Sequence, residues 1–212
     1  MSRFLFGAFC VLFMQLFLPS AATLTEGFGI ENAHAQYFKG EPYQAYPRPM
    51  EAPFASWQDA NGNATSLLRH KGEVILLNFW ATWCGPCVIE MPDLDAIQAK
   101  YEQAGLKVIA VSLDEEGIDK VRKFYAENNL SHLEAFNDND GSSAASFNAR
   151  KLPMSFLINH EGKVLGLVNG FARWEKPEYE QEIQKALRAR ASAQAETAEP
   201  FVNNRKVMGV SN

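Results

Sequence analysis

A pair of cysteines lies where a strongly apolar run of the sequence gives way to a helical pattern. The run Val74–Trp80 (VILLNFW) is apolar enough for a strand buried on both faces. The segment 83–87 (WCGPC) follows it and holds two cysteines, three positions apart. From about Pro86 to Lys100, apolar residues recur at the spacing of one helix face: Val88, Ile89, Met91, Leu94, Ile97 and Tyr101. This order predicts a central strand, a short loop carrying both cysteines, and an amphipathic helix.

The position of these cysteines predicts a reactive pair. Cys84 falls at the start of the helix, where unpaired backbone N–H groups and the helix dipole stabilise a thiolate, the nucleophile in disulfide exchange. Pro86 suits the first helical turn because its missing N–H would have no helical partner there, and Gly85 keeps side-chain bulk out of the loop. Cys87 lies one turn inside the helix, within reach of a mixed disulfide on Cys84. We therefore expect Cys84 to attack and Cys87 to resolve.

The remaining pattern alternates strands with helices and predicts an α/β layered fold. The segment Asn159–Gly162 (NHEG) between two apolar runs predicts a hairpin, so the sheet should be mixed with an antiparallel edge. Residues 131–141 are expected to be loop. The expected strands are Phe54–Trp57, Val74–Trp80, Val108–Leu113, Ser155–Ile158 and Val164–Val168, and the expected later helices are Ile118–Tyr125, Ser142–Arg150 and Pro177 to about Ala191.

The first residues of the chain are typical of an export signal. Phe4–Leu18 is almost wholly apolar after a short, weakly positive start, and its length fits a signal-peptide core. Small residues favour cleavage after Ala22, with Ala35 as a second candidate position. The uncharged stretch Phe4–Thr25 could instead remain as an N-terminal membrane anchor. Either outcome predicts an exported, periplasmic protein, soluble after cleavage or tethered to the inner membrane.

Four segments are therefore expected along the chain of 212 residues, which is long enough for one domain with extensions. Residues 1–22 are the signal peptide or N-terminal membrane anchor. Residues 23–50, rich in Gly, Pro and scattered aromatic residues, are expected to be a linker or extended segment. Residues 51–191 should form the α/β domain. Residues 192–212 are expected to be a flexible tail, because the composition there turns to Ala, Glu, Gln and Asn.

Composition excludes several classes of protein. Hydrophobic residues make up 47% of the chain and charged residues 21%, as in ordinary globular proteins. The net charge of -5 argues against nucleic acid as a partner, because such proteins carry a concentrated basic face. Removal of the signal would also remove Cys10 and leave only Cys84 and Cys87. A disulfide closing so short a loop constrains little chain entropy, so chemistry explains the pair better than a structural role.

Four stretches together resemble one family. The run Leu76–Cys87 (LLNFWATWCGPC) is very close to the signature of the thioredoxin superfamily, and of its TlpA/ResA/CcmG branch in particular. The segment Glu90–Pro92 (EMP) matches the extension of that motif. Leu152–Ile158 (LPMSFLI) resembles the later segment whose proline is cis, and Asn159–Lys163 (NHEGK) resembles the hairpin after it. The resemblance covers about residues 51–190 and is far more specific than an isolated pair of cysteines.

The resemblance implies a thioredoxin fold, in which helices flank a central mixed β-sheet, with the extra strand and helix elements of the TlpA-like branch. It implies a cis Leu152–Pro153 bond packed against the cysteine loop, offering backbone groups to an extended substrate peptide. The alternative is a trans proline that merely begins a strand. Residues expected to contact substrate are Trp83, Gly85, Pro86, Leu152 and Pro153. Trp83 is expected to be exposed beside Cys84, since aromatic residues are enriched at interaction surfaces; the alternative is a packing role.

Asn78 and Glu90 form the other part of the expected site. Cytoplasmic thioredoxins usually carry a buried aspartate at the place of Asn78, whose amide cannot titrate, so proton transfer at Cys87 needs another group. Glu90 lies three residues after Cys87, on roughly the same helix face, and the family places a functional glutamate there. A carboxylate so placed could take the proton of Cys87. The alternative is a solvated acid that only complements the helix dipole.

The expected activity is that of an exported thiol-disulfide oxidoreductase, with catalytic residues Cys84, Cys87 and Glu90 and no cofactor. The Gly-Pro pair resembles that of reducing thioredoxins, so the resemblance implies a reductase recharged by a membrane electron donor of the DsbD/CcdA type. Implied substrates are cysteine pairs of apocytochrome c or of copper-site proteins. Two alternatives remain open, an oxidase or isomerase of protein disulfides and a Cu(I)-binding chaperone. No metal site is assigned, since the four histidines, His34, His70, His132 and His160, lack close ligand spacing.

Overall fold

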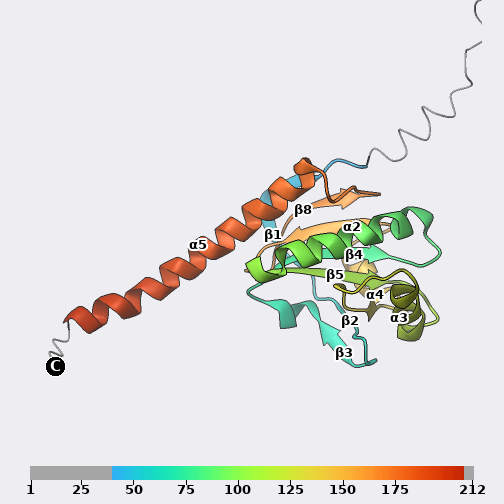
Figure 1. The fold of residues 1–212 in the computed structure, drawn as a ribbon, viewed down its shortest axis with the longest axis horizontal. Helices are drawn as coiled ribbons and strands as arrows, with labels where there is room; N and C mark the ends of the chain where they lie inside the picture. Colours follow the sequence, from blue (N-terminus) through green and yellow to red (C-terminus); the bar gives the residue numbers. More distant parts are fainter. Residues whose placement is uncertain (1–39, 208–212) are drawn as a thin grey trace, which may run out of the picture. The chain divides into compact units, whose positions relative to one another are not determined.

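A computed structural model describes residues 40–207, with side chains up to residue 197 (Figure 1). The signal or anchor expected at residues 1–22 lies outside the described residues. The strands are β1 Gln44–Glu51, β2 Ser56–Gln58, β3 Ala64–Ser66, β4 Val74–Trp80, β5 Leu106–Ser112, β6 Phe136–Asn137, β7 Met154–Ile158 and β8 Lys163–Asn169. The α-helices are α2 Gly85–Tyr101, α3 Ile118–Glu127, α4 Ser142–Ser146 and α5 Pro177–Val207, and the 3-10 helices are η1 Leu67–His70 and η2 Glu102–Ala104.

The described strands form one mixed sheet of eight strands in the order β1-β8-β7-β4-β5-β6-β2-β3. The apolar strand β4 lies inside this sheet, parallel to β5 and antiparallel to β7, and every one of its residues is buried. β7 and β8 pair antiparallel around the turn Asn159–Gly162, which confirms the predicted hairpin. The α/β architecture with a mixed sheet and flanking helices is therefore confirmed.

Alternating side chains of β4 enter two separate cores, one on each face of the sheet. Leu76 and Trp80 belong to the core that α2, α3 and α5 cover, whereas Leu77 and Phe79 face the core beside α4 and η1. The first core also contains both cysteines and the helix residues Met91, Leu94, Val121, Tyr125, Ile183 and Leu187. The second is rich in aromatic rings, namely those of Trp57, Phe79, Phe136, Phe147 and Phe156.

The linker or extended segment expected over residues 23–50 ends in a regular strand, because Gln44–Glu51 forms β1 and belongs to the sheet of the domain. β1 pairs antiparallel with β8 at the end of the sheet, with Gln44 opposite Leu167 and Ala45 opposite Gly166. Its sequence, QAYPRPME, does not predict a strand, because prolines are rare in central strands. An edge strand tolerates them, and the register here shifts between Ala45 and Met50.

The final helix is longer than predicted. It buries Tyr179, Ile183 and Leu187 as expected, but it continues to Val207 and does not end near Ala191. The Ala-, Glu- and Gln-rich part of the expected tail, residues 191–199, consists mostly of strong helix formers, which favours continuation of the helix beyond Ala191. No helix within residues 40–207 combines the length and hydrophobicity that a membrane span requires.

Three smaller boundaries also differ from the prediction. The first short strand, expected at Phe54–Trp57, is Ser56–Gln58 and pairs with β3. The loop expected at residues 131–141 contains β6, a two-residue strand whose pairing with β2 and β5 is a tertiary effect without a local signal. Helix α4 ends at Ser146, before the predicted Arg150, and Asn148 has the positive φ of 55° that closes many helices.

The contact between β1 and β8 leaves no room for a side chain at Gly166, where an added Cβ would lie 2.4 Å from the carbonyl oxygen of Gln44. Gly166→Ala should therefore push β1 away from β8 and lower the free energy of unfolding by about 1–3 kcal/mol. Urea denaturation of the oxidised protein measures this. Gly85→Ala is the matched control, because its Cβ would meet no atom within 4 Å. Equal stability of the two variants would contradict the predicted clash.

Candidate active site

Cys84 and Cys87 form a disulfide at the junction of β4 and α2. Cys84 immediately precedes the helix, and its Sγ accepts a hydrogen bond from the backbone N–H of Cys87 at 3.4 Å. Pro86 occupies the first turn, where its missing N–H is not required. Cys84 is thus at the helix start where the sequence placed it, and the unpaired N–H groups of a helix start favour negative charge.

The two cysteines differ in exposure to solvent. Cys84 retains 7% of its surface exposed, whereas Cys87 is completely buried. The neighbouring Trp83 is exposed over 67% of its surface, as expected, and Ile89 adds a second exposed apolar side chain on α2. The small exposed part of Cys84 therefore lies next to an exposed apolar side chain in the sequence, whereas Cys87 has no exposed surface.

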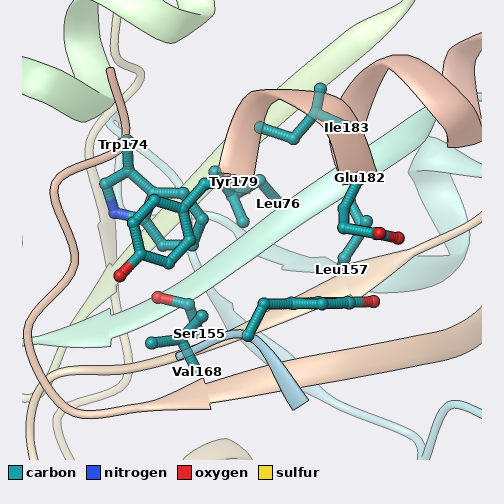
Figure 2. Close-up of a pocket in the computed structure, with 9 residues that line it drawn as sticks. Leu76, Ser155, Leu157, Val168, Trp174, Tyr179, Glu182 and Ile183 are labelled. Carbon is teal, nitrogen blue, oxygen red and sulfur yellow. The ribbon is translucent and has the colours of Figure 1, made fainter. Parts of the chain in front are cut away.

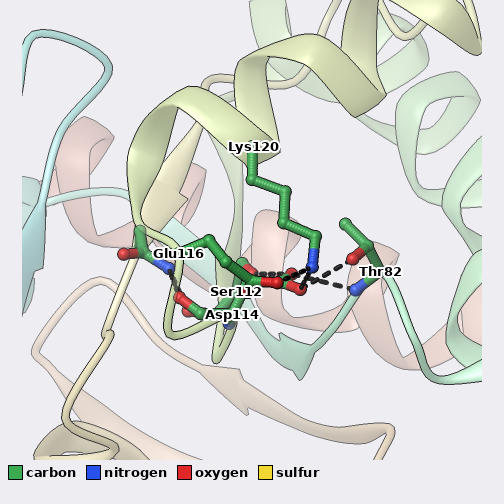
Figure 3. A network of polar contacts seen from close by, with 6 residues as sticks. Thr82, Ser112, Asp114, Glu116 and Lys120 are labelled. Carbon is green, nitrogen blue, oxygen red and sulfur yellow. Dashed lines mark hydrogen bonds and ion pairs between the residues drawn. The ribbon is translucent and has the colours of Figure 1, made fainter.

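A buried carboxylate fixes the loop between β4 and the cysteines (Figure 3). Asp114 accepts the backbone N–H of Thr82 at 2.9 Å and the Thr82 hydroxyl at 2.6 Å, and it also accepts the hydroxyl of Ser112 at 2.6 Å. Lys120 of α3 pairs with it at 3.1 Å. Burial alone would raise the pKa of Asp114, but the hydrogen bonds from Ser112 and Thr82 and the contact with Lys120 hold it below its usual value.

Sequence reasoning missed this anchor. Asp114 belongs to an acidic run, Asp114–Glu116, which by itself indicates only that acids are favoured ahead of a helix. The partner Thr82 lies 32 positions away, and parallel pairing of β4 with β5 brings the two strand ends together. The available signal was that Thr82 and Asp114 each follow the carboxyl end of an expected strand, because such ends meet at one edge when the strands are parallel.

Glu90 is fully buried on the inner side of α2, so the solvated-acid interpretation is wrong. Its Oε1 accepts a hydrogen bond from Asn78 Nδ2 at 2.7 Å, and its Oε2 accepts the backbone N–H of Ala172 at 3.0 Å. Burial raises the pKa of Glu90 to about 8, and the bonds from Ala172 and Asn78 only partly oppose this shift. A carboxyl group with this affinity for protons can exchange one with a thiol near neutral pH.

Asn78 connects Glu90 to the neighbouring strand. Its Nδ2 also donates to the hydroxyl of Ser155 at 2.9 Å, because Asn78 and Ser155 lie opposite each other in the β4–β7 register. Ser155 in turn lines a cavity of about 10 Å³ between the sheet and α5 (Figure 2). The rings of Trp174 and Tyr179 lie across this cavity from the strand. Sequence reasoning did not identify Ser155, whose pairing with Asn78 depends on sheet register.

A second acidic residue of α2, Asp93, lies one turn after Glu90. Arg173 forms an ion pair with Asp93 at 3.5 Å and with Glu175 at 2.7 Å. Burial, followed by the neighbouring Glu175, raises the pKa of Asp93 to about 7. The segment that follows β8 therefore contacts α2 at two points, through Ala172 on Glu90 and through Arg173 on Asp93.

The Leu152–Pro153 bond is cis, as predicted. Pro153 is buried and Leu152 half-buried, with Leu152 packing against both cores. Met154 stands opposite Phe79, next to the last residue of β4, so this bond lies at the same edge of the sheet as the cysteine loop. Within the described part of the chain, no group of three or more His, Cys, Asp or Glu side chains is placed to hold a metal ion.

A disulfide at the start of a helix, beside the end of a central strand in a mixed sheet, defines a thioredoxin-like thiol-disulfide oxidoreductase. The chain belongs to the Redoxin family, which it matches over residues 49–183. It is 37% identical over 120 residues to the thiol-disulfide oxidoreductase ResA of Bacillus thuringiensis, covering 57% of this chain and 68% of that protein. To ResA of Bacillus subtilis it is 32% identical over 146 residues, covering 68% of this chain and 76% of that protein.

Solved structures agree with this assignment. A crystal structure from Chlorobium tepidum, described as a candidate thiol:disulfide interchange protein DsbE, matches with a TM-score of 0.61 at 34% identity. That match covers 68% of this chain and 99% of the other. A solution structure from Neisseria meningitidis, described as a candidate thioredoxin, matches with a TM-score of 0.56 at 30% identity, covering 65% of this chain and 89% of the other.

The buried Glu90 predicts a characteristic dependence of stability on pH. Its folded pKa of about 8 exceeds the ordinary value of 4.5, so between these limits the unfolded state releases a proton that the folded state keeps. Stability is therefore lost as pH rises through this window. Relative to Glu90→Gln, the wild type should lose roughly 3 kcal/mol of unfolding free energy between about pH 5 and about pH 8.

Denaturant unfolding of the oxidised proteins across this pH range measures the difference. Asp93 titrates in the same window, so the comparison is between variants rather than within one protein. Glu115→Gln, at an exposed acid, is the control and should run parallel to the wild type. Parallel curves for the wild type and Glu90→Gln would contradict the prediction.

Proposed function

We propose that this protein is an exported reductase of disulfides in specific partner proteins. The observation that carries the proposal is the unequal exposure of the two cysteines at the start of α2, because Cys84 keeps 7% of its surface exposed whereas Cys87 is completely buried. This arrangement suits a dithiol that meets a partner through one sulfur and releases it through the other. Export is supported by the apolar Phe4–Leu18 segment of the sequence.

The reaction begins from the reduced pair. The Cys84 thiolate attacks one sulfur of the partner disulfide, the partner S–S bond breaks, and its other sulfur leaves as a thiolate that takes a proton. Cys87 then loses its proton and attacks Cys84 Sγ, which breaks the mixed disulfide and releases the second partner thiol. Two electrons pass to the partner, and the Cys84–Cys87 disulfide is the oxidised product.

Glu90 is proposed to accept the proton of Cys87 and to return it. The two residues lie three positions apart on α2, and the folded pKa of about 8 brings the carboxyl group close to the ordinary range of a thiol. Proton transfer between groups of similar affinity has a small energetic cost. Glu90 therefore acts as the base when Cys87 attacks, and as the acid when the pair is reduced again.

The remaining roles follow the surface around Cys84. Trp83, Gly85 and Pro86 lie next to Cys84 along the chain, and Leu152 and Pro153 lie at the same edge of the sheet. An extended partner peptide is proposed to contact these residues. Cysteine pairs of apocytochrome c or of copper-site proteins are the proposed substrates. A membrane donor of the DsbD/CcdA type is proposed to return electrons to the pair.

The equilibrium reduction potential of the Cys84–Cys87 pair tests the direction of the reaction. Thiol trapping in graded redox buffers should give about -200 mV or lower, as for reductases that need an electron supply. A value near -120 mV, roughly that of a strong oxidant, would replace the reductase by an oxidase. Cu(I) titration of the reduced protein distinguishes the chaperone alternative, in which metal binding would occur without disulfide turnover.

The order of attack is tested by single substitutions. Cys87→Ser should accumulate a mixed disulfide with a model protein disulfide, because serine cannot resolve it, and non-reducing electrophoresis detects the adduct. Cys84→Ser is the matched control and should give no adduct at the same protein concentration. An adduct that forms in Cys84→Ser and not in Cys87→Ser would reverse the two roles.

A further inference from the structure

The amide of Asn78 has a one-sided set of contacts. Its Nδ2 donates to Glu90 Oε1 at 2.7 Å and to Ser155 Oγ at 2.9 Å, while its Oδ1 is buried and has no hydrogen-bond partner. Asn78, Glu90 and Ser155 are all buried, and they come from β4, α2 and β7. A buried carbonyl without a partner costs free energy, so something must favour this orientation of the amide.

The favouring interaction is the carboxylate. The nitrogen end of the amide meets an oxygen that carries negative charge when Glu90 is ionised, and hydrogen bonds to charged groups are stronger than those between neutral groups. When Glu90 is ionised, the reversed amide would place Oδ1 against Glu90 Oε1, so that two acceptors would face each other. Ser155 holds the second N–H of the amide and so keeps the first one directed at Glu90.

We propose that Asn78 and Ser155 are positioning residues that favour the ionised form of Glu90 and so set the pH at which it exchanges a proton with Cys87. Asn78 supplies the donor, and Ser155 fixes the orientation of that donor from across the β4–β7 pair. This inference rests on the proposed function, because it gives Glu90 the proton of Cys87. Because the Asn78 amide carries no charge, Glu90 titrates beside it without a second carboxyl group at position 78.

Other groups act on Glu90 but remain constant in the comparison. Asp93, one turn along α2, disfavours the charge of Glu90. Burial of the ring raises the pKa of Tyr179 on α5, and the charge of Glu90 also contributes to this shift. The segment after β8 contributes the backbone N–H of Ala172, and Arg173 and Glu175 act through Asp93. Cys87 lies on α2 itself. Substitutions at positions 78 and 155 leave all of these side chains in place.

The test is a carbon-13 NMR titration of the Glu90 carboxyl in the oxidised, full-length protein. Asn78→Ala should move the midpoint upward by about one pH unit, because a charged hydrogen bond is lost. Ser155→Ala should move it in the same direction by less, and Ser155→Thr, which keeps the hydroxyl, should restore the wild-type value. The matched control is Gln98→Ala. It also removes a buried side-chain amide, but this amide lies on α2 and is bonded to backbone groups of β5.

Gln98→Ala should lower stability without moving the midpoint. A midpoint that stays at the wild-type value in both Asn78→Ala and Ser155→Ala would overturn the proposal. If Asn78→Ala does not fold, an unchanged midpoint in Ser155→Ala alone would overturn it. The alkaline part of the pH–rate profile for disulfide reduction should shift with the midpoint. A midpoint that moves while the rate profile stays fixed supports the positioning role, but removes Glu90 from the proposed reaction.

Discussion

The buried carboxyl group of Glu90 joins three parts of the chain that are distant in sequence. It lies on α2, it accepts a hydrogen bond from Asn78 on β4, and it accepts another from Ala172 in the segment after β8. A charge in this position is costly unless its hydrogen bonds are made. These two hydrogen bonds, together with the apolar residues of α2 in the first core, hold the helix and both cysteines against the sheet.

Asp114 has the complementary role on the other side of the cysteine loop. It is held in its ionised form by hydrogen bonds and by Lys120, whereas burial raises the pKa of Glu90. Asp114 fixes the backbone at Thr82, whereas Glu90 keeps an affinity for protons near neutral pH. Two buried carboxyl groups thus have opposite properties, which the number and charge of their partners decide.

The sequence could predict what depends on local pattern. The apolar run of β4, the position of Cys84 at a helix start and the hairpin at Asn159–Gly162 each have a signal within a few residues. The pairing of Asn78 with Ser155, and of Thr82 with Asp114, has no such signal because strand register brings the partners together. Strand β1 escaped prediction for a related reason, since its prolines are acceptable only at the end of a sheet.

Those prolines also affect the outer border of the sheet. Pro47 and Pro49 remove two N–H donors from β1, and β1 is the last strand on its side. An extended polypeptide that approached this border would find a strand with two prolines and an irregular register, so it would not add readily as another strand. If extended partner chains bind at the cysteines as proposed, this border of the sheet discourages the same chains from adding to it as further strands.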